Sequence, residues 1–215
     1  MSEDERPAGG QSRAARQRRL GAARDEAAGC RRCELWERGT QTVFGQGRAG
    51  VELMLVGEQP GDQEDCAGEP FVGPAGKVLG EALAEAGLDQ TPRYVTNAVK
   101  HFNWEPRGKR RLHMKPNLAH IMACRFWLEE EIAAVAPRVI VALGATAARA
   151  LLGPSVRVMR DRGKWLTSPL AGNVTVTVHP SSLLRAPTPE ARQEARAAFV
   201  ADLRRVAQRL ETPDS

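Results

Sequence analysis

The sequence lacks any run of about 20 apolar residues, so it predicts no helix that crosses a membrane. Its first residues, MSEDERPAGGQSRAARQRRLGAA, also lack the apolar core of a signal peptide. A cytoplasmic protein with no membrane partner is therefore expected. No internal repeat is visible. At 215 residues, with 42% hydrophobic content, the chain predicts one folded, monomeric domain over residues 13–212 behind a disordered basic tail over residues 1–12.

Cysteine is also scarce, with four residues in the whole chain. Disulfides are rare in the cytosol, so these cysteines suggest metal binding or reactivity before bridges. Cys30 and Cys33 form a C-x-x-C pair that precedes the first expected strand, whereas a redox pair opens a helix within a βαβ unit. A metal centre with two more distant ligands is the better interpretation. Cys66 and Cys124 lie far along the chain from this pair.

Basic residues are in excess, and the formal net charge is +5. Most of these residues are arginine, whose planar guanidinium suits bidentate contacts with phosphate. Nucleic acid therefore heads the expected partners. The alternative is that the charge serves solubility alone.

Apolar patterning predicts alternating strands and helices. The expected strands cover residues 51–56, 94–99, 138–143 and 174–178, and the expected helices cover residues 13–29, 75–87, 117–135, 144–152 and 189–210. Residues 100–116 show no periodicity and are expected to form a long loop. Alternation of this kind predicts an α/β fold whose mostly parallel sheet lies between layers of helices.

The segment VGEQPGDQEDCAGEPFVGPAGKVL, residues 56–79, is the most informative part of the chain. A short apolar strand leads into a glycine-rich turn that carries Glu58, and Phe71 follows just before the Gly-Pro-Ala-Gly start of a helix. Glycines allow close approach of backbone to a ligand, and helix starts offer free N–H groups to anions. These features predict a pocket at the strand ends. An acidic surface loop with a buried phenylalanine is the alternative.

Polar side chains arrive at the same expected sheet edge from three strands. The first strand delivers Glu58 and Gln59, the second Asn97, and the last His179. The amide of Asn97 matches the imide edge of uracil and mismatches cytosine. Phe71 is placed to stack on such a base, His179 to donate to a base oxygen as it gains charge, and Glu58 to stabilise a positive sugar or orient water.

GEQPGDQEDCAGEPFVG and VHPSSLL resemble the two signature motifs of the uracil-DNA glycosylase superfamily, in its iron–sulfur branch. The resemblance extends from about Cys30 to the last helix. It implies a three-layer α/β/α sandwich with a central, mostly parallel four-stranded sheet, and a DNA-repair enzyme that cleaves the N-glycosidic bond of extrahelical deoxyuridine. By position it implies that Glu58 is the acid, that Phe71 stacks on uracil, that Asn97 reads it and that His179 lies by its O2.

The same resemblance implies a 4Fe-4S cluster. Its ordinary ligand set has a cysteine where this chain has His101, and histidine can ligate such iron. Cys30, Cys33, His101 and Cys124 are therefore the expected ligands. Cys66 is the competing fourth ligand, although recruiting it would draw the base-binding loop to the cluster. A zinc ion on the same three cysteines and one histidine stays open from sequence alone.

Residues 107–113, RGKRRLH, resemble the basic insert of UdgX-type glycosylases, which become covalently attached to uracil-containing DNA. The expectation is that His113 attacks C1′ of the sugar after uracil leaves. Its basic neighbours should disfavour the imidazolium form and keep His113 nucleophilic. The residues expected to bind DNA phosphates are Lys109, Arg110, Arg111 and Ser181.

Two other functions remain open from the sequence. In one, water attacks C1′, the enzyme turns over and His113 only binds phosphate. In the other, the chain is a non-catalytic iron–sulfur protein that binds nucleic acid, although such a protein needs neither Glu58 nor Asn97. Single-stranded DNA is the expected substrate, because extracting its base avoids the free energy of unpairing.

Overall fold

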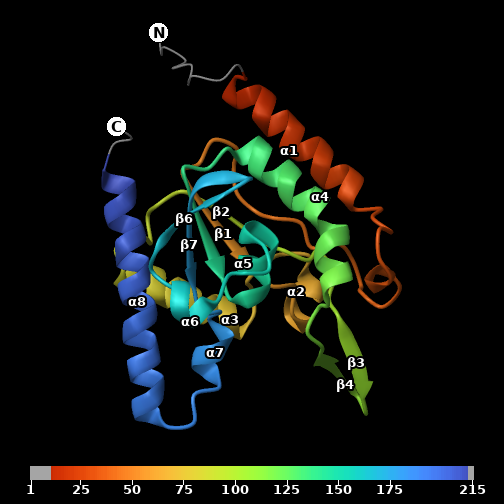
Figure 1. The fold of residues 1–215 in the computed structure, drawn as a ribbon. Coiled ribbons are helices and arrows are strands. Elements are labelled where there is room, and N and C mark those ends of the chain that lie inside the picture. Colours follow the sequence, from red (N-terminus) through yellow and green to blue (C-terminus); the bar gives the residue numbers. More distant parts are fainter. Residues whose placement is uncertain (1–10, 213–215) are drawn as a thin grey trace.

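The structure is a computed structural model that describes residues 11–212 (Figure 1). The tail predicted over residues 1–12 lies outside this range except for its last two residues. Of these, Ser12 caps the first helix by accepting a hydrogen bond from the Ala15 N–H at 3.2 Å. The helices are α1 (Arg13–Ala27), a 3-10 turn η1 (Glu34–Glu37), α2 (Asp62–Ala67), α3 (Pro74–Glu85), α4 (Leu118–Val135), α5 (Ala145–Leu152), α6 (Val158–Asp161), α7 (Ser181–Leu184) and α8 (Pro189–Glu211).

The central sheet has five strands in the order β2-β1-β5-β7-β6. Its members are β1 (Leu53–Gly57), β2 (Arg93–Asn97), β5 (Val139–Leu143), β6 (Trp165–Ser168) and β7 (Ala171–Thr177). Strands β2, β1, β5 and β7 pair in parallel, as predicted, and β6 adds an antiparallel edge strand to β7. The expected number of four strands was therefore wrong by one, because β6 is short, half exposed and without an apolar run.

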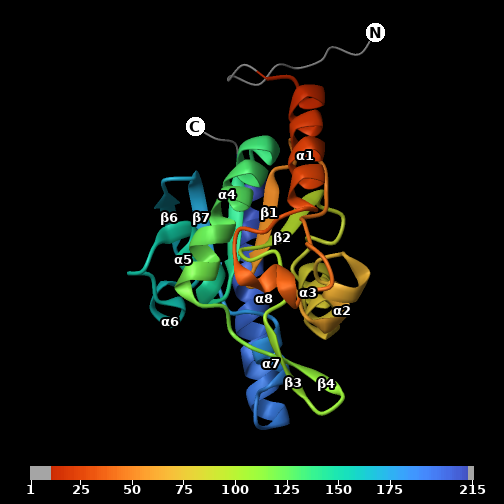
Figure 2. The same ribbon diagram turned by 90° about the vertical axis from the view of Figure 1, so that its right-hand side faces the viewer.

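Helices cover both faces of the sheet, which confirms the three-layer α/β/α architecture (Figures 1 and 2). Alternate residues of β1 point to opposite faces. Met54 and Val56 join a core with α4 and α5, whereas Leu53 and Leu55 join a second core with α3 and α8. Burial on both faces explains why β1 and β5 read as unbroken apolar runs. Helix α1 packs on α4 (Figure 1).

Residues 100–116 were expected to form a loop, and this expectation was wrong. Strands β3 (Trp104–Arg107) and β4 (Arg110–His113) form an antiparallel hairpin that projects from the lower part of the molecule in Figures 1 and 2. Its two-residue turn begins at Gly108, whose φ of 61° suits glycine. The acidic loop after β1 also contains an unexpected short helix, α2. Within residues 11–212, every helix is too short or too polar to cross a membrane.

Candidate active site

The carboxyl ends of the parallel strands bring three of the predicted site residues to one edge of the sheet. Gly57, the last residue of β1, is in register with Asn97, the last residue of β2. Glu58 follows β1 directly, and His179 lies two residues beyond the end of β7. Because β5 lies between β1 and β7, one strand separates the strand that leads to Glu58 from the strand that leads to His179.

Gly57 makes room for the two side chains expected to hold the base. A Cβ atom at this position would lie 2.3 Å from Asn97 Oδ1 and 2.6 Å from Phe71 Cζ. Phe71 itself has a φ of 60°, a left-handed conformation that non-glycine residues seldom adopt and that clusters at functional sites. Its ring stacks beside that of His179, with centroids 6.0 Å apart and planes at 29°.

A buried ion pair holds the backbone of Asn97 in place. Lys100 Nζ lies 2.5 Å from Glu131 Oε2, and neither side chain is exposed to solvent. The same ammonium donates to the Asn97 carbonyl at 2.7 Å and to Thr96 Oγ1 at 2.7 Å. Glu131 also accepts from the Tyr94 hydroxyl. The pair is well satisfied, and it fixes the end of β2 against α4.

Glu58 lies between two partners. Its Oε2 accepts a hydrogen bond from the Thr146 hydroxyl, and its Oε1 lies 3.6 Å from His113 Nε2. The acid from β1 and the histidine from the hairpin therefore meet, as the expected roles require. Thr146, in the first turn of α5, was not predicted from the sequence, where it is one residue in an unremarkable helix start.

His179 is held in a defined tautomer. Its Nδ1 accepts from the Ser181 backbone N–H at 3.2 Å, and because an N–H can only donate, the ring proton of the neutral form is on Nε2. Burial lowers the pKa of His179 to about 4, which keeps the ring neutral at physiological pH. The Ser181 hydroxyl lies 2.8 Å from Nδ1 and accepts from Arg185 Nη1 at 3.1 Å. Sequence reasoning did not identify Arg185.

His113 ends strand β4, and its side chain is 48% exposed.

Gln59 ties the base of the hairpin to β1, because its amide Nε2 donates to the backbone carbonyls of Asn103 and Met114, at 3.2 and 3.1 Å. The Oε1 atom of Gln59 is buried and has no partner within residues 11–212. Of the two amide ends, the oxygen is thus the one that remains for a ligand.

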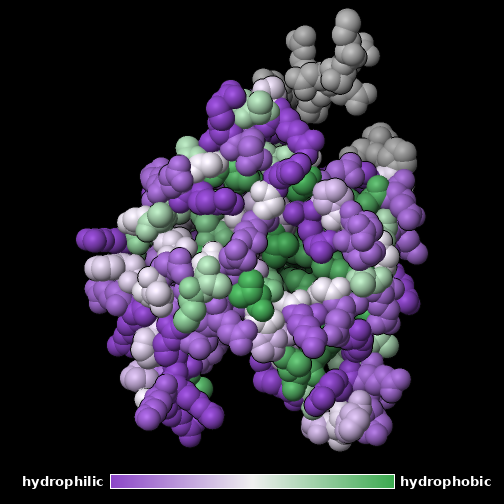
Figure 3. Space-filling view, turned by 180° about the vertical axis from the view of Figure 1, so that it is seen from behind, coloured by the Kyte–Doolittle hydropathy of each residue, from purple (hydrophilic) through white to green (hydrophobic). Residues whose placement is uncertain are grey.

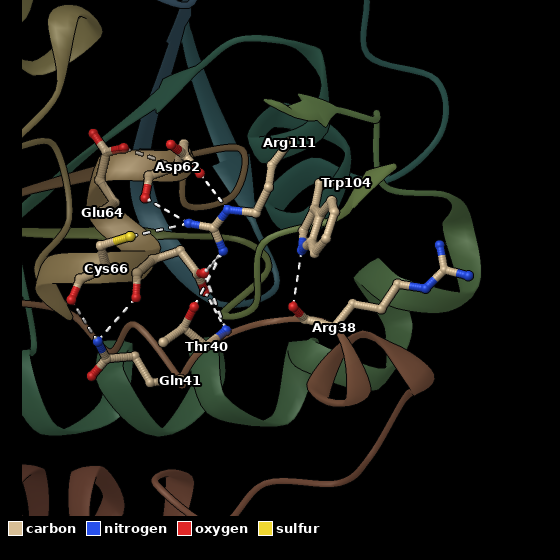
Figure 4. A network of polar contacts seen from close by, with 10 residues as sticks. Arg38, Thr40, Gln41, Asp62, Glu64, Cys66, Trp104 and Arg111 are labelled. Carbon is tan, nitrogen blue, oxygen red and sulfur yellow. Dashed lines mark hydrogen bonds and ion pairs between the residues drawn. The ribbon is translucent and has the colours of Figure 1, made fainter. Parts of the chain in front are cut away.

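Arg111 anchors the hairpin to α2 (Figure 4). Its guanidinium forms ion pairs with Asp62 and, at 2.5 Å, with the buried Asp65. It also donates to Cys66 Sγ at 3.1 Å and to Thr40 Oγ1 at 3.2 Å. Most N–H donors of Arg111 are therefore used in contacts within the protein, and fewer are available to bind a phosphate.

Lys109 and Arg110 are exposed at the turn of the hairpin, and Arg107, the remaining basic residue of the insert, is exposed beside them. The charged group nearest His113 is the Glu58 carboxylate, 3.6 Å away, and the charge of Arg111 is compensated by Asp62 and Asp65. Three exposed cations, Arg107, Lys109 and Arg110, thus remain near the tip, where they face solvent.

The four predicted metal ligands are only partly gathered. The Cys33 and Cys124 side chains form a hydrogen bond that lowers the pKa of Cys33 to about 6, while the same hydrogen bond and burial raise the pKa of Cys124. Cys30 Sγ accepts from the Trp127 indole at 3.1 Å. No disulfide involves any of the cysteines. Among residues 11–212, no group of three or more His, Cys, Asp or Glu side chains is arranged to hold a metal ion.

The chemistry of these side chains nevertheless suits a metal or cluster. His101 is buried, its Nε2 lies 3.0 Å from Thr42 Oγ1, and its Nδ1 has no partner within the described residues. Burial lowers the pKa of His101, which favours the neutral form that ligates metals. Cys66, the competing ligand, is exposed on α2 beside Arg111.

A cavity of about 500 Å³ lies between α3 and strands β1 and β2, where apolar residues gather in a hollow (Figure 3). Phe71 forms part of its wall, but Glu58, Asn97 and His179 do not. The cavity is thus distinct from the edge where the polar side chains meet.

Comparison with known proteins identifies the family of this chain. The profile of the family described as the uracil DNA glycosylase superfamily matches residues 44–204. The chain is 36% identical to the type-4 uracil-DNA glycosylase of Pyrobaculum aerophilum over 165 residues, 74% of this chain and 81% of that relative. It is 38% identical to the type-4 enzyme of Thermotoga maritima over 157 residues, 73% of this chain and 78% of that relative. The chain therefore belongs to the uracil-DNA glycosylase superfamily.

Proposed function

We propose that this protein excises uracil from DNA and becomes covalently linked through His113 to C1′ of the resulting deoxyribose. The observation that carries the proposal is the position of His113, whose Nε2 lies 3.6 Å from Glu58 Oε1. A nucleophile beside the acid that serves the sugar can reach the same carbon. The type-4 relatives, named as uracil-DNA glycosylases, support the first half of the proposal.

Base recognition falls to Asn97 and Phe71. Asn97 is 3% exposed, so an unmatched base edge would leave its amide unpaired in a buried site. Its two donors and its acceptor complement the N3–H and O4 of uracil. Phe71 supplies the face on which the base stacks, and the unpartnered Oε1 of Gln59 supports its role as a further acceptor.

Bond cleavage releases uracil with the electron pair of the N1–C1′ bond. The Nε2–H of neutral His179 donates to O2 as negative charge develops on the base. The Glu58 carboxylate stabilises the positive charge that remains on the sugar.

Capture follows when the imidazole of His113 donates an electron pair to C1′. The new N–C1′ bond makes the ring an imidazolium, whose ring proton is then lost to Glu58 or to solvent. A nucleophile fixed near C1′ has an effective concentration that water cannot match. The chain therefore alkylates itself instead of turning over.

DNA binding is assigned to the exposed Lys109 and Arg110 at the hairpin tip. Ser181 and Arg111, which already pairs with Asp62 and Asp65, are further candidates. Single-stranded DNA is the preferred substrate on energetic grounds. Cys30, Cys33, Cys124 and His101 would hold a 4Fe-4S cluster, which would cross-link these segments and supply no step of the reaction. The thiolate character of Cys33 and the unpartnered Nδ1 of His101 support this set.

A denaturing gel tests the proposal directly. Wild-type protein mixed with a single-stranded uracil oligonucleotide should give a band that survives SDS, heat and high salt, because purely electrostatic complexes dissociate as salt rises. The His113→Ala variant should lose this band yet still release uracil, since water then reaches C1′, and it should leave alkali-labile abasic sites.

Two results would contradict the proposal. A resistant band from His113→Ala would mean that another residue is the nucleophile. Many uracils released per wild-type molecule would mean that water attacks, as in an ordinary glycosylase. Glu58→Gln should lower both crosslinking and base release, because Glu58 acts before the two outcomes diverge.

A further inference from the structure

The hydroxyl of Thr146 is buried at the centre of the site. The residue is 2% exposed, and its Oγ1 donates to Glu58 Oε2. Glu58 is the only hydrogen-bond partner of this hydroxyl within residues 11–212. The neighbouring carboxylate oxygen, Oε1, faces His113. Each oxygen of Glu58 thus has a separate task.

The turn from β5 into α5 places Thr146 there. Gly144 has a φ of 92°, and its N–H donates to the Thr177 carbonyl at 2.9 Å, which joins the start of α5 to the end of β7. A Cβ atom on Gly144 would lie 2.9 Å from His179 Cβ, so only glycine allows this approach. The first turn of α5 therefore adjoins both His179 and Glu58.

Helix capping does not account for the Thr146 side chain. Gly144 is the N-cap of α5, and no side chain caps the helix. Instead the hydroxyl points across to the end of β1. A free carboxylate rotates between conformers of similar energy, whereas one that accepts a hydrogen bond at one oxygen is held in a single orientation.

We propose that Thr146 is a positioning residue, which binds one oxygen of Glu58 and so turns the other toward His113 and the sugar. This inference rests on the proposed function of the same site. It adds a residue from α5 to a reaction otherwise assigned to the ends of β1, β2 and β7 and to the hairpin. Thr146 itself touches neither the base nor the sugar.

The test compares Thr146→Val, which keeps the shape of the side chain but removes its hydroxyl, with Thr146→Ser, which keeps the hydroxyl. Single-turnover uracil release at saturating single-stranded DNA should fall about tenfold in Thr146→Val, the loss expected of one hydrogen bond to a charged group. The DNA concentration for half-saturation should not change. Thr146→Ser should stay within about twofold of wild type, since its hydroxyl can make the same bond.

Ser168→Ala is the matched control. The buried hydroxyl of Ser168 donates to the Leu151 carbonyl at 2.5 Å. Ser168 pairs with Ala171 at the start of β7, so it lies at the end of the sheet opposite to the site. Losing this hydroxyl should affect stability without slowing uracil release. Should Thr146→Val fail to fold, Thr146→Ala takes its place in the same comparison.

A double-mutant cycle with Glu58→Gln decides whether Thr146 acts through Glu58. The double variant Glu58→Gln with Thr146→Val should be no slower than Glu58→Gln alone. Equal losses in both backgrounds, an unaffected Thr146→Val, or a Thr146→Ser as slow as Thr146→Val would each overturn the inference while the glycosylase reaction stands. A wild type that releases uracil without a resistant band would refute covalent capture alone, and one that releases no uracil would refute both.

Discussion

At the scale of single residues, a backbone contact fixes the tautomer of the His179 imidazole. The Ser181 N–H donates to Nδ1, and burial lowers the pKa of the ring to about 4. The ring should stay neutral, with its proton on Nε2, as pH falls from 8 through 6.5, and should gain a second proton only near pH 4. Nitrogen-15 NMR of the imidazoles can follow this, because the chain has four histidines and His179→Asn assigns the signal. A titration near pH 6.5 would contradict it.

Gly57 gives a second prediction at this scale. Gly57→Ala would place a methyl group against Asn97 Oδ1 and the Phe71 ring, with no way to fit without moving one of them. Uracil excision should fall at least tenfold, because either displacement spoils the complementarity that holds the base. Gly80→Ala is the control, since its Cβ meets nothing within 4 Å on the exposed face of α3. It should leave excision unchanged and stabilise α3 slightly.

The site residues that could be predicted from the sequence lie at strand ends, whereas those that were missed depend on tertiary contacts. Glu58, Asn97 and His179 lie at or just beyond the ends of strands, and parallel strands bring their carboxyl ends to one edge whatever the details of packing. Thr146 and Arg185 join the site through a hydrogen bond to another side chain, which no local pattern reveals.

At the scale of elements, the β3–β4 hairpin was missed because its residues are mostly polar and exposed and include Pro106. Alternation of apolar and polar residues, the usual sign of a strand, cannot appear in a hairpin that buries neither face. The two-residue Gly108-Lys109 turn was the remaining signal. Contacts of Gln59 at the base of the hairpin and of Arg111 within β4 hold the hairpin against the rest of the protein.

Arg111 should therefore act as an anchor. Arg111→Met would leave the buried Asp65 without its cation, lower the free energy of unfolding by about 1.5–3 kcal/mol and slow covalent capture by loosening the strand that carries His113. Arg110→Met, on an exposed side chain of the same strand, should change stability by less than about 0.5 kcal/mol.

Salt dependence separates the two roles. If Arg110 contacts a phosphate, Arg110→Met should reduce the slope of log affinity against log salt by about 1, whereas Arg111→Met should change the slope less. Denaturant unfolding and DNA binding at several salt concentrations provide the measurements. An Arg111→Met protein of wild-type stability with a reduced salt slope would identify Arg111 as a phosphate ligand.

At the scale of the whole molecule, the alternation of strands and helices was enough to predict the three layers and the parallel core, because a parallel sheet buries both faces and needs crossover helices. The number of strands could not be predicted from this alternation. An antiparallel edge strand such as β6 requires no crossover helix and carries little apolar pattern. The predicted metal ligands are a similar case, because they lie in three segments that only the tertiary fold can bring together.

These segments suggest why a cluster would stabilise the whole fold. Cys30 and Cys33 lie in a stretch between α1 and η1 without helix or strand, Cys124 lies in α4, and His101 follows β2. A shared cluster would join all three, and its binding free energy would then add to that of folding. Protein purified without oxygen should be brown, and Cys30→Ser or His101→Ala should bleach it and lower its melting temperature.

Cys66→Ser is the control for the cluster, because Cys66 is exposed on α2 and hydrogen-bonded by Arg111. This variant should keep the colour and the melting temperature of wild type. Iron and sulfide analysis together with visible absorption give the measurement for every variant. A colourless wild type with one zinc per chain would assign a zinc site to the same ligands, and loss of colour in Cys66→Ser but not in His101→Ala would make Cys66 the fourth ligand. That last result would also require α2 to leave Arg111, so it should be accompanied by a loosened hairpin and slower capture by His113.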